Sequence, residues 1–155
     1  MKSTLSPAVA LALALAVALL MAPAQARPGG DAEYALGRQY RNGSAVRRDP
    51  VQALHHMRAA AAQGHAGAMF ALSNMLMAGE GAPRDPVAAR RYLEASAALD
   101  YPEALQQLAL HIQDGSLGFA RDPQHAAQLM RAMEHAMKHR LHEAHGADAE
   151  AGHGH

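Results

Sequence analysis

The chain has 155 residues, in which 14 Lys and Arg balance 14 Asp and Glu, with 11 His and no Cys. This even charge balance argues against nucleic acid or an anionic membrane surface as the main partner. The lack of Cys excludes disulfides and lipid attachment through an N-terminal cysteine. With no Trp, two Phe and nine Met, a core must be built from Ala, Leu and Met on closely packed helices.

The first 26 residues have the pattern of an export signal. Lys2 gives a weakly basic start, residues 8–22 form an unbroken apolar run, and Ala24 and Ala26 are small residues that suit a signal peptidase. A membrane anchor is the alternative, but a run of about 15 residues is shorter than the ~20 that a spanning helix needs. We therefore predict a signal peptide, 1–26, that is removed, and a periplasmic or secreted protein without stable membrane insertion.

Three similar turns divide the rest of the chain at intervals of about 36 residues. They are residues 43–49, 79–85 and 115–122, and each is followed by Pro. The initial glycine suits the left-handed position just past a helix, and the final aspartate can cap a new helix that begins with Pro. The predicted turn and cap residues are Gly43, Asp49, Gly79, Asp85, Gly115 and Asp122.

The segments around these turns predict three helical hairpins, after a short linker of residues 27–30. The hairpins cover about 31–64, 65–100 and 101–142, in a domain of 31–144. Asp31 can cap the first helix, and the apolar spacing places one set of residues inward: Ala32, Leu36, Tyr40, Ala53, Met57, Ala60, Ala68, Leu72, Leu76, Ala89, Tyr92, Leu93, Ala97, Ala104, Leu108 and Ile112. The fold class is therefore all-α, a solenoid of three stacked antiparallel hairpins, about six helices.

The last helix is predicted to be longer than the others and to cap the end of the stack. Its inward stripe is Ala126, Met130, Met133, Met137 and Leu141, which carries the helix to about His142. Residues 145–155 contain Gly, Ala, Asp, Glu and His without apolar periodicity. We predict a disordered, His-rich tail there.

The repeated residues resemble the Sel1-like repeat, a relative of the tetratricopeptide repeat. The first hairpin matches at Ala32, Leu36, Gly37, Tyr40, Gly43, Val46, Asp49, Ala53, Ala60, Ala61 and Gly64. The second matches at Ala68, Leu72, Gly79, Gly81, Asp85, Ala89, Tyr92 and Ala97, with Ser73 and Asp100 in place of two glycines. The third matches at Ala104, Leu108, Gly115, Asp122 and Ala126. The resemblance covers Asp31 to about Arg140 and implies an α-solenoid that holds other proteins or peptides, as in many exported bacterial proteins.

A second stripe on the first helix of each hairpin is the candidate partner-binding groove. In stacked hairpins this face lines the inner curve, where aromatic, Met, Arg and amide side chains suit a protein or peptide partner. Its residues are Tyr34, Arg38, Arg41, Phe70, Asn74, Met77, Gln106, Leu110 and Gln113. The alternative is that Phe70 and Met77 pack under the neighbouring hairpin.

The C-terminal histidines form a second candidate site. On a helix, His135, His139 and His142 lie opposite the Met stripe and face solvent, and their spacings of four and three bring imidazoles together. With His145, His153 and His155 from the tail they could bind Zn, Ni or Cu. The alternative is a solvated polar face with no cofactor.

No catalytic motif is present in the sequence. It lacks a nucleophile elbow, a P-loop, a dinucleotide fingerprint, the HExxH motif and Cys. We therefore predict a non-enzymatic scaffold that binds a protein or peptide, with a His-rich periplasmic metal-binding protein as the alternative. An envelope hydrolase is a third hypothesis, because some proteins with Sel1-like repeats carry enzyme names.

Overall fold

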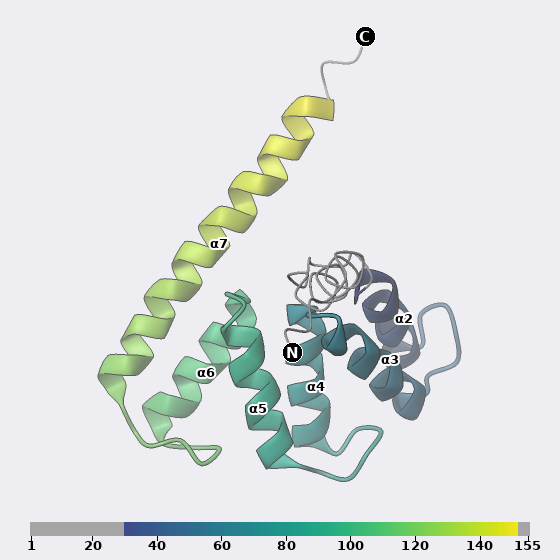
Figure 1. Cartoon of the computed structure of the whole chain (residues 1–155), viewed down its shortest axis with the longest axis horizontal. Coiled ribbons are helices and arrows are strands. Elements are labelled where there is room, and N and C mark those ends of the chain that lie inside the picture. Colours follow the sequence, from purple (N-terminus) through teal and green to yellow (C-terminus); the bar gives the residue numbers. More distant parts are fainter. Residues whose placement is uncertain (1–29, 152–155) are drawn as a thin grey trace, which may run out of the picture.

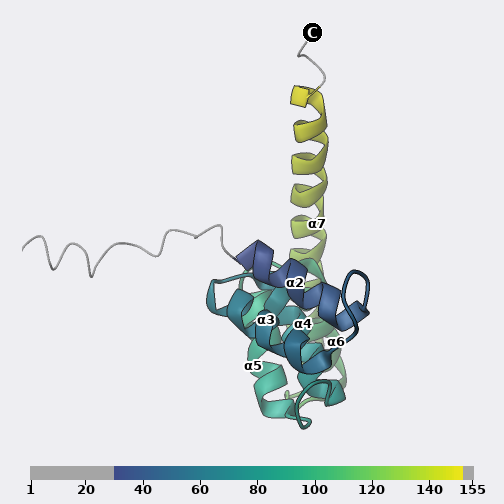
Figure 2. The same cartoon turned by 90° about the vertical axis from the view of Figure 1, so that its right-hand side faces the viewer.

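The computed structural model describes residues 30–151, of which 144–151 are described by their backbone alone. In chain order the helices are α2 (Gly30–Asn42), α3 (Pro50–Ala62), α4 (Ala66–Ala78), α5 (Pro86–Ala97), α6 (Pro102–Asp114) and α7 (Pro123–Ala151). Each odd-numbered helix packs antiparallel to the one before it, and the three hairpins stack in sequence (Figures 1 and 2). The prediction of an all-α stack of three hairpins is confirmed, and residues 30–151 contain no strand.

Local sequence accounts for where the helices begin and end. Asp49 caps α3 by accepting hydrogen bonds from the amides of Val51 and Gln52, at 3.0 and 3.1 Å. Asp85 accepts one from the amide of Ala88 at 2.9 Å, and Asp122 caps α7 in the same way. The preceding turns start with glycine at φ of 70° (Gly43), 72° (Gly79) and 70° (Gly115). These are the left-handed residues and side-chain caps that the repeated turn predicts.

The third turn has one more residue than the other two, and Arg90 of α5 holds it in place. The Arg90 guanidinium donates to the carbonyl oxygen of Gly118 and lies 3.8 Å from the centre of the Phe119 ring. The longer turn therefore lies at the surface and is tied to α5.

The core consists of two clusters that follow the stack. The first lies between α3 and α4 and contains Met57, Leu72 and Met75, and the second joins α5, α6 and α7 around Leu93, Leu105 and Leu108. Alanines fill the remaining core positions and allow close helix approach. Most of the predicted inward positions are buried. Ala32 is exposed, whereas its equivalents Ala68 and Ala104 are buried. The difference arises because a preceding hairpin packs beside α4 and α6, but no described hairpin precedes α2.

Helix α2 begins at Gly30, so the predicted linker of residues 27–30 is one residue too long, and Asp31 lies inside the first turn and not at the N-cap. The rest of that linker, residues 27–29, and the predicted signal peptide, 1–26, lie outside the described residues. Between residues 30 and 151, no helix combines the length and apolarity that crossing a membrane requires.

Helix α7 differs from the prediction in its length. It continues to Ala151, past the expected end near His142, so the predicted disordered tail is wrong for residues 145–151. The segment after His142 is rich in Ala and Glu, which are strong helix formers. His153 and His155 lie outside the described residues.

The face that α7 buries also differs from the prediction. Leu129, Ala132 and Ala136 join Met130 and Met133 against the second cluster. Two members of the predicted stripe are largely exposed instead, Met137 at 48% and Leu141 at 57%. The buried face is turned by roughly 70° from the Met stripe at ~100° per residue. Ala132 and Ala136 are thus part of the face that packs against the second cluster, and two larger apolar side chains remain at the surface.

Glu80 links the first two hairpins. Its carboxylate, 16% exposed, accepts from Arg41 of α2 at 3.0 Å and from Arg48 of the first turn at 3.0 Å. We expect Glu80→Gln to lower the free energy of unfolding by about 1 kcal/mol, and less at high salt. Urea denaturation at two salt concentrations measures this.

Glu94→Gln is the matched control for Glu80→Gln. Glu94 pairs with Arg90 within α5, where the side chains are 43% and 36% exposed. An exposed pair within one helix contributes about 0.3–0.5 kcal/mol. Equal losses in the two variants would show that Glu80 does not stabilise the contact between hairpins.

Candidate functional site

Aromatic side chains from all three hairpins meet at the start of the first helices. The Tyr34 ring of α2 stacks on the His65 ring at 4.2 Å between centroids. Tyr34 also interacts with Tyr101, the N-cap residue of α6, and the Tyr101 ring lies 5.6 Å from the Phe70 ring of α4. We call Tyr34, His65, Phe70 and Tyr101 the aromatic junction. It fixes α2, α4 and α6 relative to one another.

Tyr101 also connects the junction to α7. The Arg140 guanidinium carbon lies 5.2 Å from the centre of the Tyr101 ring. Arg140 donates two hydrogen bonds to the carboxylate of Glu103, at 3.1 and 3.4 Å. Burial, together with the nearby Glu103 carboxylate, raises the pKa of Tyr101, so its hydroxyl stays protonated at neutral pH. The hydrogen bond to Glu103 raises the pKa of Arg140.

Part of the predicted groove is used inside the protein. Arg41 pairs with Glu80, Phe70 packs against the second core cluster, and the Asn74 side-chain oxygen accepts from Gln107 at 3.3 Å. Tyr34 belongs to the aromatic junction, and Met77 is half-buried. For Phe70, packing against the neighbouring hairpin was the alternative interpretation, and the structure agrees with it.

The other groove residues remain at the surface. Arg38 on α2 is exposed, and its guanidinium carbon lies 5.8 Å from the centre of the Tyr34 ring. On α6, Gln106 and Gln113 are exposed, and Leu110 between them is 48% exposed. We call Arg38, Gln106, Leu110 and Gln113 the open face. It presents one apolar and three polar side chains from helices whose positions are fixed.

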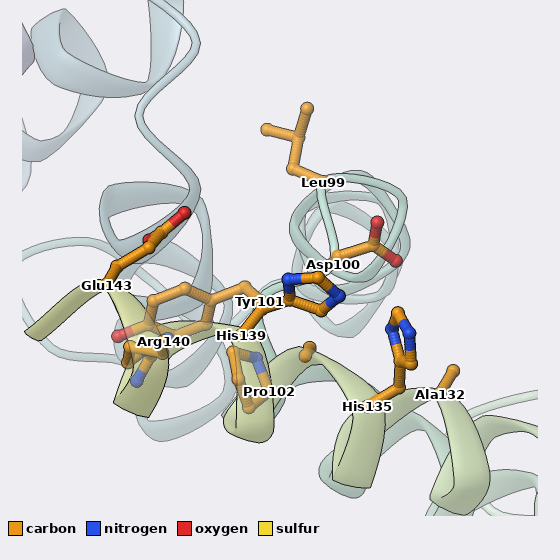
Figure 3. Close-up of a pocket in the computed structure, with 10 residues that line it drawn as sticks. Leu99, Asp100, Tyr101, Pro102, Ala132, His135, His139, Arg140 and Glu143 are labelled. Carbon is orange, nitrogen blue, oxygen red and sulfur yellow. The ribbon is translucent and has the colours of Figure 1, made fainter. Parts of the chain in front are cut away.

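A cleft of about 620 Å³ lies between the α5–α6 turn and α7. Leu99, Asp100, Tyr101 and Pro102 form one wall, and Ala132, His135, Ala136, His139, Arg140 and Glu143 form the other (Figure 3). In this orientation of α7, His135 and His139 remain exposed and lie on the side of the helix that faces the turn.

The repeat is also recognised by comparison with known protein families. The model of the Sel1 repeat matches residues 30–65, 66–101 and 102–133, which include both helices of the first two hairpins. The chain belongs to the Sel1 repeat family. Sel1 repeats are protein-interaction modules, and proteins built from them are generally non-catalytic scaffolds.

Solved Sel1 repeat structures share this architecture. The crystal structure of a Sel1 repeat protein from Oxalobacter formigenes has a TM-score of 0.64 and 23% identity, over 67% of this chain and 41% of that one. The second is c5321, a protective antigen present in uropathogenic Escherichia coli strains that displays an SLR fold. It has a TM-score of 0.63 and 26% identity, over 68% of this chain and 22% of that one. This Sel1 repeat chain therefore spans less than half the length of either. No curated protein matches it.

The histidines of this Sel1 repeat chain separate into two groups. The rings of His135 and His139 lie 4.5 Å apart, whereas His142 is exposed and does not line the cleft. The side chains of His145, His153 and His155 lie outside the described residues. Among the side chains that are described, no three His, Asp or Glu surround a common point. The predicted six-histidine site therefore remains a prediction, of which the structure brings two members together.

Sequence reasoning missed two features of the site. His65 caps α4, since its ring nitrogen accepts from the amide of Ala68 at 3.0 Å, and the same ring anchors the aromatic junction. The repeat pattern identifies Asp100 only as a replacement for a glycine, yet Asp100 lines the cleft opposite the His pair. The aspartate in place of a glycine was the one sequence feature that could have indicated a special role for this position.

Proposed function

We propose that this protein is an exported, non-catalytic scaffold that binds a protein or peptide partner through the open face. The family supports the general role, because Sel1 repeats are interaction modules. The specific surface is our inference from the exposure of its side chains and the rigidity of the helices that carry them.

The observation that carries the proposal is the exposed Leu110 between two exposed glutamines on α6. An apolar side chain ringed by amides can pack against one apolar residue of a partner, while the amides hydrogen-bond its backbone. The aromatic junction and the Arg140–Glu103 pair hold the N-terminal end of α6, and Leu105, Leu108 and Ile112 anchor the helix in the second core cluster. Binding therefore costs little ordering of the scaffold.

Arg38 gives the open face its charge. The guanidinium is exposed on α2, whereas nearby Arg41 is neutralised by Glu80. A partner with a carboxylate placed to reach Arg38, and an apolar residue placed to reach Leu110, fits this surface best.

A photo-crosslinking amino acid at position 110, in the native host, identifies the partner. The control carries it at position 87, since Val87 is 71% exposed on α5, outside the open face. Calorimetry with the purified partner then tests the surface. We expect Leu110→Ser to weaken binding at least tenfold and Val87→Ser to change it less than twofold. Phe70 is left unchanged, because it packs in the core.

Two outcomes would contradict the open-face assignment. One is that positions 110 and 87 capture the same proteins equally. The other is that Leu110→Ser and Arg38→Ala together bind the captured partner as tightly as the original protein while giving the same circular dichroism spectrum.

Export is the second part of the proposal, and it rests on residues 1–26 of the sequence. We expect the protein from the periplasm or medium of the native host to begin at Arg27, as measured by its intact mass. Recovery of full-length protein from the cytoplasm alone would overturn export without affecting the open face.

A further inference from the structure

The cleft beside α7 combines an imidazole pair with a carboxylate from a separate element. His135 and His139 are one helical turn apart, both exposed, with ring centroids 4.5 Å apart. Two histidines at this spacing on one helix face supply two ligands to one metal ion in known metal sites. In Figure 3 both rings extend from α7 toward the α5–α6 turn, on the side where Asp100 lies.

Asp100 has a backbone conformation that glycine adopts more readily. Its φ is 54°, in the left-handed region, and Gly64 takes the equivalent place in the first hairpin with φ of 85°. The hydrogen bonds of the two turns correspond, since the amide of Asp100 donates to Ala97 and that of Gly64 to Ala61. Aspartate tolerates this region better than most residues but less well than glycine. The turn therefore accepts a less favourable residue, and its carboxylate lines the cleft.

The charges around the cleft favour a cation. The lining contains two carboxylates, Asp100 and Glu143, and one guanidinium, Arg140. Arg140 is already paired with Glu103 by two hydrogen bonds, and it lies over the Tyr101 ring. Its charge is thus neutralised by a partner on α6, so the carboxylates of Asp100 and Glu143 are the lining charges without such a partner in the cleft wall.

We propose that His135, His139 and Asp100 bind a divalent transition-metal ion of the Zn, Ni and Cu class. Imidazole with carboxylate suits these ions, whereas Mg and Ca prefer oxygen ligands. As the side chains lie, the three groups do not yet surround one point. The exposed Asp100 side chain must rotate to complete the site. Because its ligands come from two elements, the bound ion joins α7 to the α5–α6 turn. This site does not depend on the proposed partner binding.

The test uses the full chain without an affinity tag, with His145, His153 and His155 replaced by Ala so that tail histidines do not contribute. Calorimetry with ZnCl₂ at pH 7.5 measures affinity and stoichiometry, and thermal unfolding with and without ZnCl₂ measures stabilisation. The variants are His135→Ala, His139→Ala and Asp100→Asn, because Asn also tolerates a left-handed φ. His142→Ala is the control, on the same helix but outside the cleft lining.

We expect one Zn per chain, a loss of at least tenfold in affinity for each of the three variants, and no change for His142→Ala. We also expect Zn to raise the unfolding temperature of the parent and not of Asp100→Asn. Equal weakening by His142→Ala and His139→Ala would overturn the proposal, as it would indicate a diffuse histidine surface. If Asp100→Asn binds Zn with unchanged affinity, Asp100 is not a ligand. If the chain with only the three tail histidines replaced does not bind Zn, the site does not exist.

Discussion

Gly81→Ala is expected to lower the free energy of unfolding by about 3 kcal/mol. Gly81 has φ of 79°, which costs an alanine roughly 1–2 kcal/mol. A Cβ there would also collide with the carbonyl oxygen of Pro50 and press on the Cβ of Leu54 at 3.3 Å. Since these atoms belong to α3, the second turn would be pushed away from the first hairpin. Relieving such a collision costs about a further 1–3 kcal/mol. Urea denaturation followed by circular dichroism measures the change.

Gly64→Ala separates the two causes. Gly64 also has a left-handed φ, of 85°, but a Cβ there would have nothing within 4 Å. We expect a loss of about 1 kcal/mol, from backbone conformation alone. If the two substitutions cost the same, the close approach of Gly81 to α3 contributes nothing to stability.

Leu93→Ala is expected to lower the free energy of unfolding by about 3 kcal/mol. Leu93 is 0% exposed in α5 and belongs to the second core cluster, between Ala97 and the residues of α6. Its removal loses buried apolar area and leaves a cavity, for which core Leu→Ala changes typically cost 2–5 kcal/mol. Small domains have a total stability of about 5–15 kcal/mol. The variant should therefore unfold at a clearly lower urea concentration.

Val87→Ala, on the same helix, is the control for Leu93→Ala. Val87 is 71% exposed, so its truncation should change the free energy of unfolding by less than about 0.5 kcal/mol. A similar loss in both variants would mean that the effect comes from helix α5 and not from the buried cluster.

The two predicted sites show where sequence reasoning reaches its limit. The groove stripe was chosen by spacing alone, which cannot tell that Phe70 finds a partner in Tyr101 across the stack. Likewise, the three histidines share a helix face, but only His135 and His139 meet the α5–α6 turn. Both outcomes depend on contacts between residues far apart in the chain.

Local features of the chain were sufficient for the architecture. The 36-residue period, the glycine at the start of each turn and the Asp-Pro pair at its end specify six helices and their pairing. A left-handed residue and a side-chain cap act within a few positions of themselves, so these signals can be interpreted without knowledge of the fold. The buried alanines follow from the same periodicity.

The orientation of α7 required the packed structure. Its Met and Leu stripe predicted one buried face, but the helix buries an adjoining face that contains Ala132 and Ala136. In the packed structure that face lies against the second core cluster, and Arg140 of the same helix pairs with Glu103 of α6. Neither is encoded in the spacing of apolar residues along one helix. The cleft, and with it the meeting of His135 and His139 with Asp100, is a consequence of that orientation.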